Sequence, residues 1–403
     1  MRRVALLCMG LAMGAASAAE AQLTMQMSNG WSFTFGGNVN AFLVYEKEND
    51  GTTSATLSPG VVVGNSDQGA SRIRTGLLPA FAVFDAKGKE GNTDLGVHFG
   101  FAPQIQCGGR DVDGDGAADG VAHDCFGAQI DMRQVYLTVG GSWGQILAGR
   151  ELGLFGRQNI LTDQTLFGVG ATGGQISGGT TLGRIGFGYI YPNFKAQMTF
   201  STPAGRPFQL SVGLFDPSSN PPYNTVEIPR VEAEGVWTQG NTKVWVGGLV
   251  QNNGTGGVAD EKATAWGGSG GVRFGSTSFS LTASGYYGKG LGTTLMFGAG
   301  TAGLGTGGGD LRKSYGGIGQ LTFTPANSKV TVAGSWGISI LENADDELDF
   351  KTKNWLASGG IYYQATKSLK AVGEFNYAVS ADDIDTNEDN KSIAPTVGLM
   401  LFF

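Results

Sequence analysis

The chain has 403 residues, of which 69 are glycine and only 15% are charged. Acidic residues outnumber basic ones by 34 to 27, and the formal net charge is −7 at pH 7. No block of basic residues occurs, which argues against a nucleic-acid partner. The glycine content lies far above the ~7% that is typical of proteins, and small residues suit strands that twist and coil into a closed wall.

The N-terminus has the three parts of a secretory signal peptide. Arginines at 2–3 precede an apolar stretch over residues 4–16, and small residues then form A-x-A cleavage sites that end at Ala18 and Ala21. The alternative, a transmembrane anchor, needs about 20 apolar residues to cross ~30 Å of hydrocarbon as a helix. We therefore expect residues 1–21 to be a signal peptide that directs export.

From residue 22 onwards, apolar and polar residues alternate with a period of two, which predicts β-strands. Val332 and Trp336, for example, share one strand face, while Ser335 lies on the other. Strands of this kind are expected, in chain order, near 31–47, 71–85, 93–104, 130–139, 143–150, 184–200, 207–215, 229–237, 242–251, 264–274, 277–287, 315–323, 329–340, 353–364, 369–379 and 392–403.

Long and short connections alternate along the chain, which favours a membrane barrel over a soluble β-sandwich. The connections near 140–143 and 238–241 are short, whereas those near 216–228 and 288–314 are long and polar. A barrel with one rim in the periplasm and the other outside the cell has this pattern. No apolar run of ~18 residues follows the signal, so insertion as helices is not expected. We predict that residues 22–403 form an all-β, 16-stranded antiparallel transmembrane β-barrel.

The last strand ends the chain on an aromatic residue. Val397, Leu399, Leu401 and Phe403 share one face. A terminal strand with alternating apolar residues and a final aromatic resembles the assembly signal of outer-membrane barrels. The alternative is a hydrophobic end of a soluble sheet. Together with the signal peptide, this predicts a location in the bacterial outer membrane.

Short motifs, in order, resemble those of the Gram-negative general porins. Residues 36–42 resemble that family's first strand, and 71–74 resemble the start of its second. Residues 133–150 are similar to the hairpin that enters its third loop, and 184–194 to the strand that leaves it. The resemblance implies a homotrimer with one pore per subunit, which would lie among outer-membrane lipid and lipopolysaccharide after insertion by the barrel-assembly machinery. It also implies that the third loop, 151–183, folds into the pore and narrows it.

In such porins, basic wall residues face loop carboxylates across the constriction. The resulting transverse field sorts solutes by charge and dipole. Arg72, Arg74 and Arg184 fit the wall, because small residues share their strand face and a lipid-facing charge near the midplane costs ~2–4 kcal/mol. The loop supplies Glu151 and Asp163 but lacks the acidic motif of the enteric members.

Two further arginines match the family's motifs, Arg133 and Arg150. Arg133 alternates with Val135 and Leu137, and this parity contradicts a position in the lumen. A position in the lumen and a position outside it therefore both stay open for Arg133. For each of these arginines the alternative is a solvated charge at the barrel rim.

Residues 105–129 form an acidic loop with two cysteines. Cys107 and Cys125 are expected to form a disulfide in an oxidising periplasm. Between them, carboxylates alternate around a glycine turn in the pattern D-x-D-x-D-G, which can supply oxygen ligands to Ca²⁺. Ala122 stands where a full EF-hand has its bidentate Glu, so a solvated acidic loop is the alternative. The candidate calcium ligands are Asp111, Asp113, Asp115 and Asp119.

Catalytic constellations are not evident in the sequence. His98 and His123 are the only histidines, and no G-x-S-x-G elbow, zinc spacing or P-loop occurs. We therefore predict a passive diffusion channel for small hydrophilic solutes and ions, not an enzyme, with no required cofactor. The alternatives are a channel selective for an anion or a small organic acid, and a non-conducting barrel that serves structure or adhesion.

Overall fold

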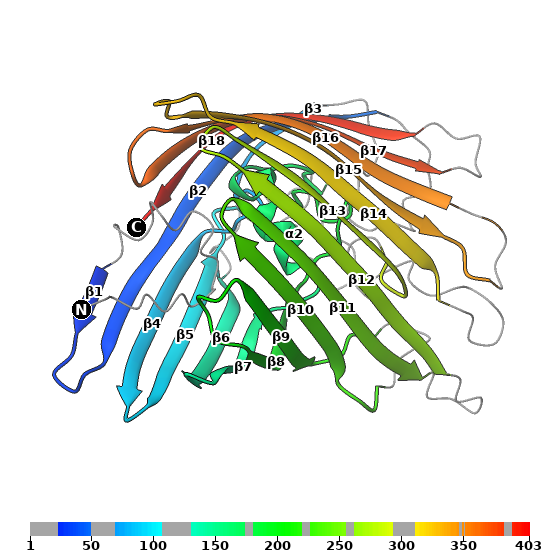
Figure 1. Cartoon of the computed structure of the whole chain (residues 1–403). Helices are drawn as coiled ribbons and strands as arrows, with labels where there is room; N and C mark the ends of the chain where they lie inside the picture. Colours follow the sequence, from blue (N-terminus) through cyan, green and yellow to red (C-terminus); the bar gives the residue numbers. More distant parts are fainter. Residues whose placement is uncertain are drawn as a thin grey trace, which may run out of the picture.

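The computed structural model describes residues 23–49, 69–106, 130–173, 180–219, 226–254, 262–292, 311–345, 349, 351–382 and 389–403. Most of them belong to one antiparallel sheet that closes on itself (Figure 1). The predicted signal peptide and the loop that carries Cys107, Cys125 and the candidate calcium ligands Asp111, Asp113, Asp115 and Asp119 lie outside the described residues. The predictions about them therefore stay predictions.

The strands are β1 (Leu23–Gln26), β2 (Ser32–Glu48), β3 (Gly69–Arg74), β4 (Phe81–Glu90), β5 (Thr93–Pro103), β6 (Ile130–Gly141), β7 (Gly144–Leu152), β8 (Phe194–Ser201), β9 (Phe208–Phe215), β10 (Arg230–Gln239), β11 (Thr242–Gly254), β12 (Lys262–Gly275), β13 (Phe279–Lys289), β14 (Lys313–Phe323), β15 (Val330–Glu342), β16 (Lys351–Gln364), β17 (Leu369–Asp382) and β18 (Asn390–Phe402).

These strands fill sixteen positions of the barrel wall. β3 and β4 pair one after the other with β2, so together they form one interrupted wall strand. On the other side of β2, β18 pairs as far as Asn38 and β1 continues the pairing from Phe35 to Ser32. The prediction of a 16-stranded antiparallel barrel is therefore confirmed, with two wall strands made of two pieces each.

The sequence predicts an unbroken strand over 71–85, but the structure interrupts it between β3 and β4. The segment 75–80 is buried, and the Leu77 N–H donates to the Gly168 carbonyl at 3.0 Å. A Cβ atom on Gly76 would stand 2.1 Å from the same carbonyl oxygen, so only glycine permits this approach. The interruption lets the chain leave the wall and contact the interior.

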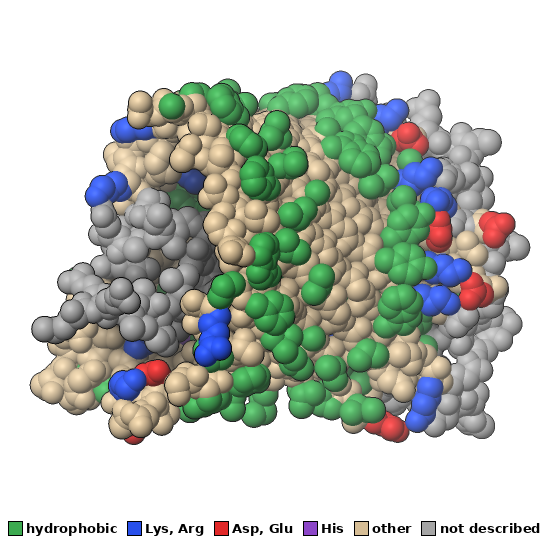
Figure 2. All heavy atoms as spheres, in the orientation of Figure 1, with side chains coloured by type: hydrophobic (Ala, Val, Ile, Leu, Met, Phe, Trp, Pro, Cys, Tyr) green, Lys and Arg blue, Asp and Glu red, His purple; other side chains and the backbone are tan. Residues whose placement is uncertain are grey.

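The two faces of the sheet differ in chemistry. Along β14, Leu321 and Phe323 are about half exposed on the outer face, while Gln320, the residue before Leu321, is buried inside. Figure 2 shows apolar side chains spread over the outer wall, with charged side chains gathered towards the barrel ends. This alternation is the one expected of a wall with lipid on one side and a polar lumen on the other.

Strand β1 and the C-terminus lie at the barrel end that carries the short turns (Figure 1). The Phe403 N–H donates to the Gly37 carbonyl at 3.0 Å, and the Phe403 ring lies 5.4 Å from that of Phe35. The last strand thereby closes the barrel against the first long one. The role of Phe403 as an assembly signal stays a prediction.

The connection between β7 and β8 folds into the barrel (Figure 1). It contains a short helix, α2 (Arg157–Thr162), and a 3₁₀ turn, η2 (Gln164–Phe167). The prediction of a strand over 184–200 was wrong in its first half, because β8 begins only at Phe194. Pro192 has no N–H to donate to a neighbouring strand, and Asn193 has a φ of 59° that no strand accommodates. Among the described residues, no helix is both long and apolar enough to cross a membrane.

Candidate functional site

The inward-folded loop between β7 and β8 occupies part of the lumen and is bound to the wall on several sides. We call the described parts of this connection, residues 153–173 and 180–193, the inner loop. Most of its side chains are buried, including polar ones such as Gln158, Asn159 and Thr165. Buried polar groups need hydrogen-bond partners, and the wall strands supply them.

Strand β10 binds the start of the inner loop through two glutamates. One Glu232 carboxylate oxygen accepts hydrogen bonds from the N–H groups of Leu154 and Phe155 at 2.7 and 2.9 Å. Glu234 accepts from the guanidinium of Arg157 at 2.6 Å and from the amide of Gln158 at 2.9 Å. Because both carboxylates are buried, these charge-assisted bonds fix the position of α2 against the wall.

Strand β17 binds the middle of the inner loop from another part of the wall. Glu374 accepts from the N–H groups of Val169 and Gly170 at 2.7 and 3.0 Å. It also accepts from the hydroxyl of Tyr362 on β16 at 2.8 Å. A third contact comes from β2, where Glu46 accepts from the hydroxyl of Thr172.

Neutral groups of other strands complete the attachment. On β14, Gln320 accepts from the N–H of Gln164 at 2.7 Å and donates to the carbonyl of Thr162 at 3.0 Å. The indole N–H of Trp245 on β11 donates to Asn159 at 2.8 Å. The inner loop is therefore held by strands from widely separated positions of the ring.

Arg184 and Asp163 both lie in the inner loop and face each other inside it. Arg184 is fully buried and donates to the carbonyl of Leu356 on β16 at 2.8 Å. Its Nε atom lies 3.9 Å from Asp163, whose carboxylate also accepts from the Tyr189 hydroxyl at 2.8 Å. Burial, and next the nearby Asp163 charge, raise the pKa of Tyr189 well above its usual value and keep this donor protonated.

The placement of Arg184 on a wall strand was therefore wrong. With Asp163 it forms a buried pair that fixes the loop, and buried groups of this kind do not face an aqueous passage. The error followed from the strand predicted over 184–200, whose alternation appeared regular although the segment is not part of the sheet.

Arg72 and Arg74 lie on the inner face of β3, while Ile73 between them is 66% exposed on the outer face. Arg74 is buried and, like Arg72, interacts electrostatically with Glu46 of the neighbouring strand. The structure thus brings these two arginines together with Glu46, the same carboxylate that binds the inner loop. Their effect on ion passage stays a prediction.

The remaining predicted residues lie apart from this cluster. Glu151 is the second-last residue of β7, buried on its inner face, where the amide of Gln134 donates to it at 2.8 Å. Arg150 is exposed on the opposite face of the same strand, so the structure does not bring it into the constriction. Arg133 pairs with Asp131 at 2.7 Å and is the extra residue at a register shift between β5 and β6. This bulge explains why simple parity could not place Arg133.

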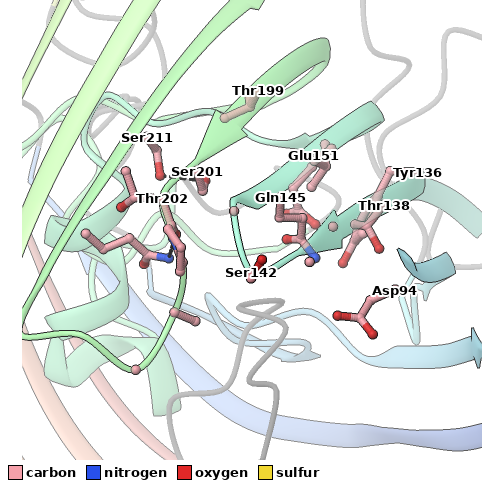
Figure 3. Close-up of a pocket in the computed structure, with 18 of the residues that line it drawn as sticks. Asp94, Tyr136, Thr138, Ser142, Gln145, Glu151, Thr199, Ser201, Thr202 and Ser211 are labelled. Carbon is pink, nitrogen blue, oxygen red and sulfur yellow. Dashed lines mark hydrogen bonds between the residues drawn. The ribbon is translucent and has the colours of Figure 1, made fainter. Parts of the chain in front are cut away.

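A cavity of about 650 Å³ lies on the inner faces of β6 to β9 and reaches their short turns (Figure 3). Many of its lining residues carry hydroxyl or amide side chains, and four are charged: Lys89, Asp94, Glu151 and Arg157. The labelled side chains include Tyr136, Thr138, Gln145, Thr199 and Ser211. Such a wall offers hydrogen bonds to water, and its two basic and two acidic residues balance in formal charge.

Sequence reasoning missed the glutamates that bind the inner loop, Glu232, Glu234 and Glu374. The signal was available, because each alternates with apolar residues on a predicted strand and a charge in that position must face the lumen. What the alternation cannot show is the partner, since Val169 and Leu154 are far from these glutamates in the sequence.

No cluster of His, Cys, Asp and Glu residues that would hold a metal ion occurs in the described part of the chain. The candidate calcium loop falls outside that part and stays a prediction.

A closed sixteen-position barrel with an apolar outer face, a polar lumen and a loop bound inside defines the class of outer-membrane channels. The chain belongs to the Gram-negative porin family, whose model matches residues 5–390. It is thus an outer-membrane β-barrel protein and a channel for small solutes.

Solved structures share the fold at low sequence identity. The outer membrane channel DcaP of Acinetobacter baumannii is 14% identical, with a TM-score of 0.66 over 94% of this chain and 99% of that one. An anion-selective porin from Comamonas acidovorans is 12% identical, with a TM-score of 0.60 over 93% and 100%. The trimer form of OmpT from Vibrio cholerae is 15% identical, with a TM-score of 0.53 over 93% and 100%. No curated protein sequence matches the chain.

Proposed function

We propose that this porin conducts small hydrophilic solutes and ions by passive diffusion, through a lumen that the inner loop narrows. One observation carries the proposal: the inner loop is hydrogen-bonded to strands around the ring, while a polar cavity of about 650 Å³ remains beside it. Loop and wall together fix the passage, and the cavity walls offer hydrogen bonds to any polar solute. No catalytic role is proposed, because the family and fold are those of channels.

Conductance across planar bilayers tests this function. The purified protein, inserted from detergent, should give discrete current steps in potassium chloride that scale with salt concentration. Block of these steps by a single solute at low concentration would instead favour a channel selective for one substrate. Correctly folded protein that gives no steps would contradict the proposal and leave a structural or adhesive barrel.

We propose further that the protein is a homotrimer. The support is its membership of the family and its likeness in fold to the OmpT structure described as a trimer. Native mass spectrometry in detergent should give three times the mass of the processed chain. A monomer under conditions that preserve the barrel would contradict this part of the proposal.

Contact with lipopolysaccharide is proposed for the outer rim at the long-loop end. Lys289, Lys313 and Lys351 lie there on the outer face of neighbouring strands, next to the rings of Tyr287 and Tyr315. Aromatic side chains favour the membrane interface, and lysines just beyond it suit lipid phosphates. Co-purified lipopolysaccharide that is lost when these lysines are replaced by Gln would support the contact. Unchanged retention would contradict it.

A further inference from the structure

Two cations face each other on the lumen wall with no carboxylate of a described residue between them. Lys243 on β11 and Arg273 on β12 are directly opposite in the strand register. Both lie on the inner face, because Val244, Val272 and Phe274 beside them are exposed on the outer face. They lie close to the turns that join the strands, on the short-turn side of the inner loop.

Like charges directly opposite on neighbouring strands are unfavourable. Glu234 is the carboxylate whose charge acts on Lys243, together with the like charges of Arg273 and Arg157. Glu234 already accepts hydrogen bonds from Arg157 and Gln158. In the described part of the chain, Lys243 and Arg273 have neither a hydrogen bond nor a salt bridge of their own. Arg157 also lies near Glu151 and Glu232, whereas Glu234, which Arg157 already engages, is the carboxylate that acts on Lys243.

Other described carboxylates of the same half of the lumen are bound to partners of their own. Asp94 pairs with Lys89 at 3.0 Å, and Asp85 with the ring of His98 at 2.9 Å. Lys370 lies 3.8 Å from the centre of the Phe167 ring, a cation–π contact that leaves its charge in place. Among the described residues, Lys243 and Arg273 are therefore left without a carboxylate partner of their own, although the whole chain is acidic.

A second like-charge pair, on the outer face, shows how a nearby carboxylate can neutralise such a pair. Lys289 on β13 and Lys313 on β14 are also directly opposite in register. Asp345 accepts from both, at 3.1 and 2.8 Å, and neutralises part of their charge. No carboxylate of a described residue accepts a hydrogen bond from Lys243 or Arg273, so their position suits an anion that enters from solution.

We propose that Lys243 and Arg273 form an anion-binding subsite of the lumen, for a small solute that carries a carboxylate or phosphate group. The guanidinium offers two parallel N–H donors to such a group, and the ammonium adds a compact charge. A wet wall site of this kind binds weakly enough to release its solute, as conduction requires. The subsite rests on the proposed function, since it needs a conducting lumen.

Reversal potentials in asymmetric salt test the subsite. The double variant Lys243→Gln, Arg273→Gln is compared with the matched outer pair Lys289→Gln, Lys313→Gln, which loses the same charge from the same register. The chloride-to-potassium permeability ratio should fall by about two- to threefold in the inner variant only, because local charges dominate within one screening length. Potassium acetate and potassium phosphate, used in turn, show whether carboxylate or phosphate is favoured.

The possible outcomes distinguish a failure of the subsite proposal from a failure of the channel proposal. An unchanged ratio in the inner variant, or an equal fall in the outer one, would overturn the subsite while the wild-type steps still support a channel. If the double variant does not insert, the single variant Lys243→Gln should lower the ratio by a smaller factor, and no fall in that variant would also overturn it. Wild-type protein without steps would refute the channel function itself.

Discussion

Adjacent residues on β17 show how differently the two faces of the wall are used. Phe375 is 52% exposed on the outer face, among other apolar side chains. Glu374 is buried on the inner face, where it accepts hydrogen bonds from Val169, Gly170 and Tyr362. The outer face thus needs only apolar character, whereas the inner face depends on particular partners. Substitutions outside should affect the whole barrel, and substitutions inside should affect the inner loop.

The largest effect is expected from a charge on the outer face. Val246 on β11 is 61% exposed there, and Val246→Arg should lower the free energy of unfolding by about 2–4 kcal/mol near the bilayer midplane. The control is Ser269→Arg, on the inner face of the adjacent strand. Urea unfolding in lipid vesicles measures the free energy of unfolding of both variants. Equal decreases would contradict the claim that one face contacts lipid while the other contacts water.

Removal of an inner-face carboxylate should release the inner loop without unfolding the barrel. Glu374→Ala leaves two backbone N–H groups, the Tyr362 hydroxyl and the Asn376 amide without this acceptor, at about 1–3 kcal/mol for each group that water cannot reach. We expect noisier single-channel currents and faster proteolysis within the inner loop. The control is Glu342→Ala, which removes a carboxylate at the last residue of β15, where it accepts from Lys351 and does not bind the inner loop. Quiet, wild-type currents in Glu374→Ala would contradict the role of this glutamate.

A smaller change at the same point is Tyr362→Phe. It removes one of the donors to Glu374 and keeps the ring, so about 0.5–1.5 kcal/mol of loop stability should be lost. Current noise should lie between that of wild type and Glu374→Ala. The control is Tyr363→Phe on the outer face, where the ring is 43% exposed. Noise at the wild-type level in Tyr362→Phe would show that the hydroxyl is dispensable.

The smallest effect concerns Asp345 and its exposed ion pairs with Lys313 and Lys289 on the outer face. Hydrogen bonds from Lys313, and then from Lys289, lower the pKa of Asp345 from its usual 3.8 to about 2. Because the pKa is depressed in the folded state, the contribution of this carboxylate is present above pH 3.8 and is lost as the pH falls towards 2. Carbon-13 NMR of the carboxyl group should give a midpoint near 2 that returns towards 3.8 in Lys313→Gln. A normal midpoint in the wild-type protein would contradict the pair.

The strands were predictable because alternation reports which residues must avoid water. It placed most of the sixteen wall positions, and it placed Arg72 and Arg74 on the inner face opposite Ile73. It failed where the chain leaves the sheet, at 75–80 and before Phe194, because glycine and proline geometry there is decided by contacts with distant segments. Arg184 was misplaced for that reason.

The chemistry of the site was less predictable than the fold. Glu232 and Glu374 bind backbone N–H groups of the inner loop, and any loop residue has such a group. The sequence therefore carries no sign of which partner is chosen. The same holds for Lys243 and Arg273, whose opposition depends on strand register.

Cysteine accessibility along β12 tests the account's central claim, that alternate residues of one strand face lipid and a water-filled lumen. Single cysteines at Gly268, Ser269, Gly270 and Arg273, in a variant with Cys107 and Cys125 replaced by Ser, would be treated with a charged thiol reagent in vesicles. Ser269→Cys and Arg273→Cys should react and reduce the current, while Gly268→Cys and Gly270→Cys should remain unmodified. Equal reaction at all four positions would contradict the account.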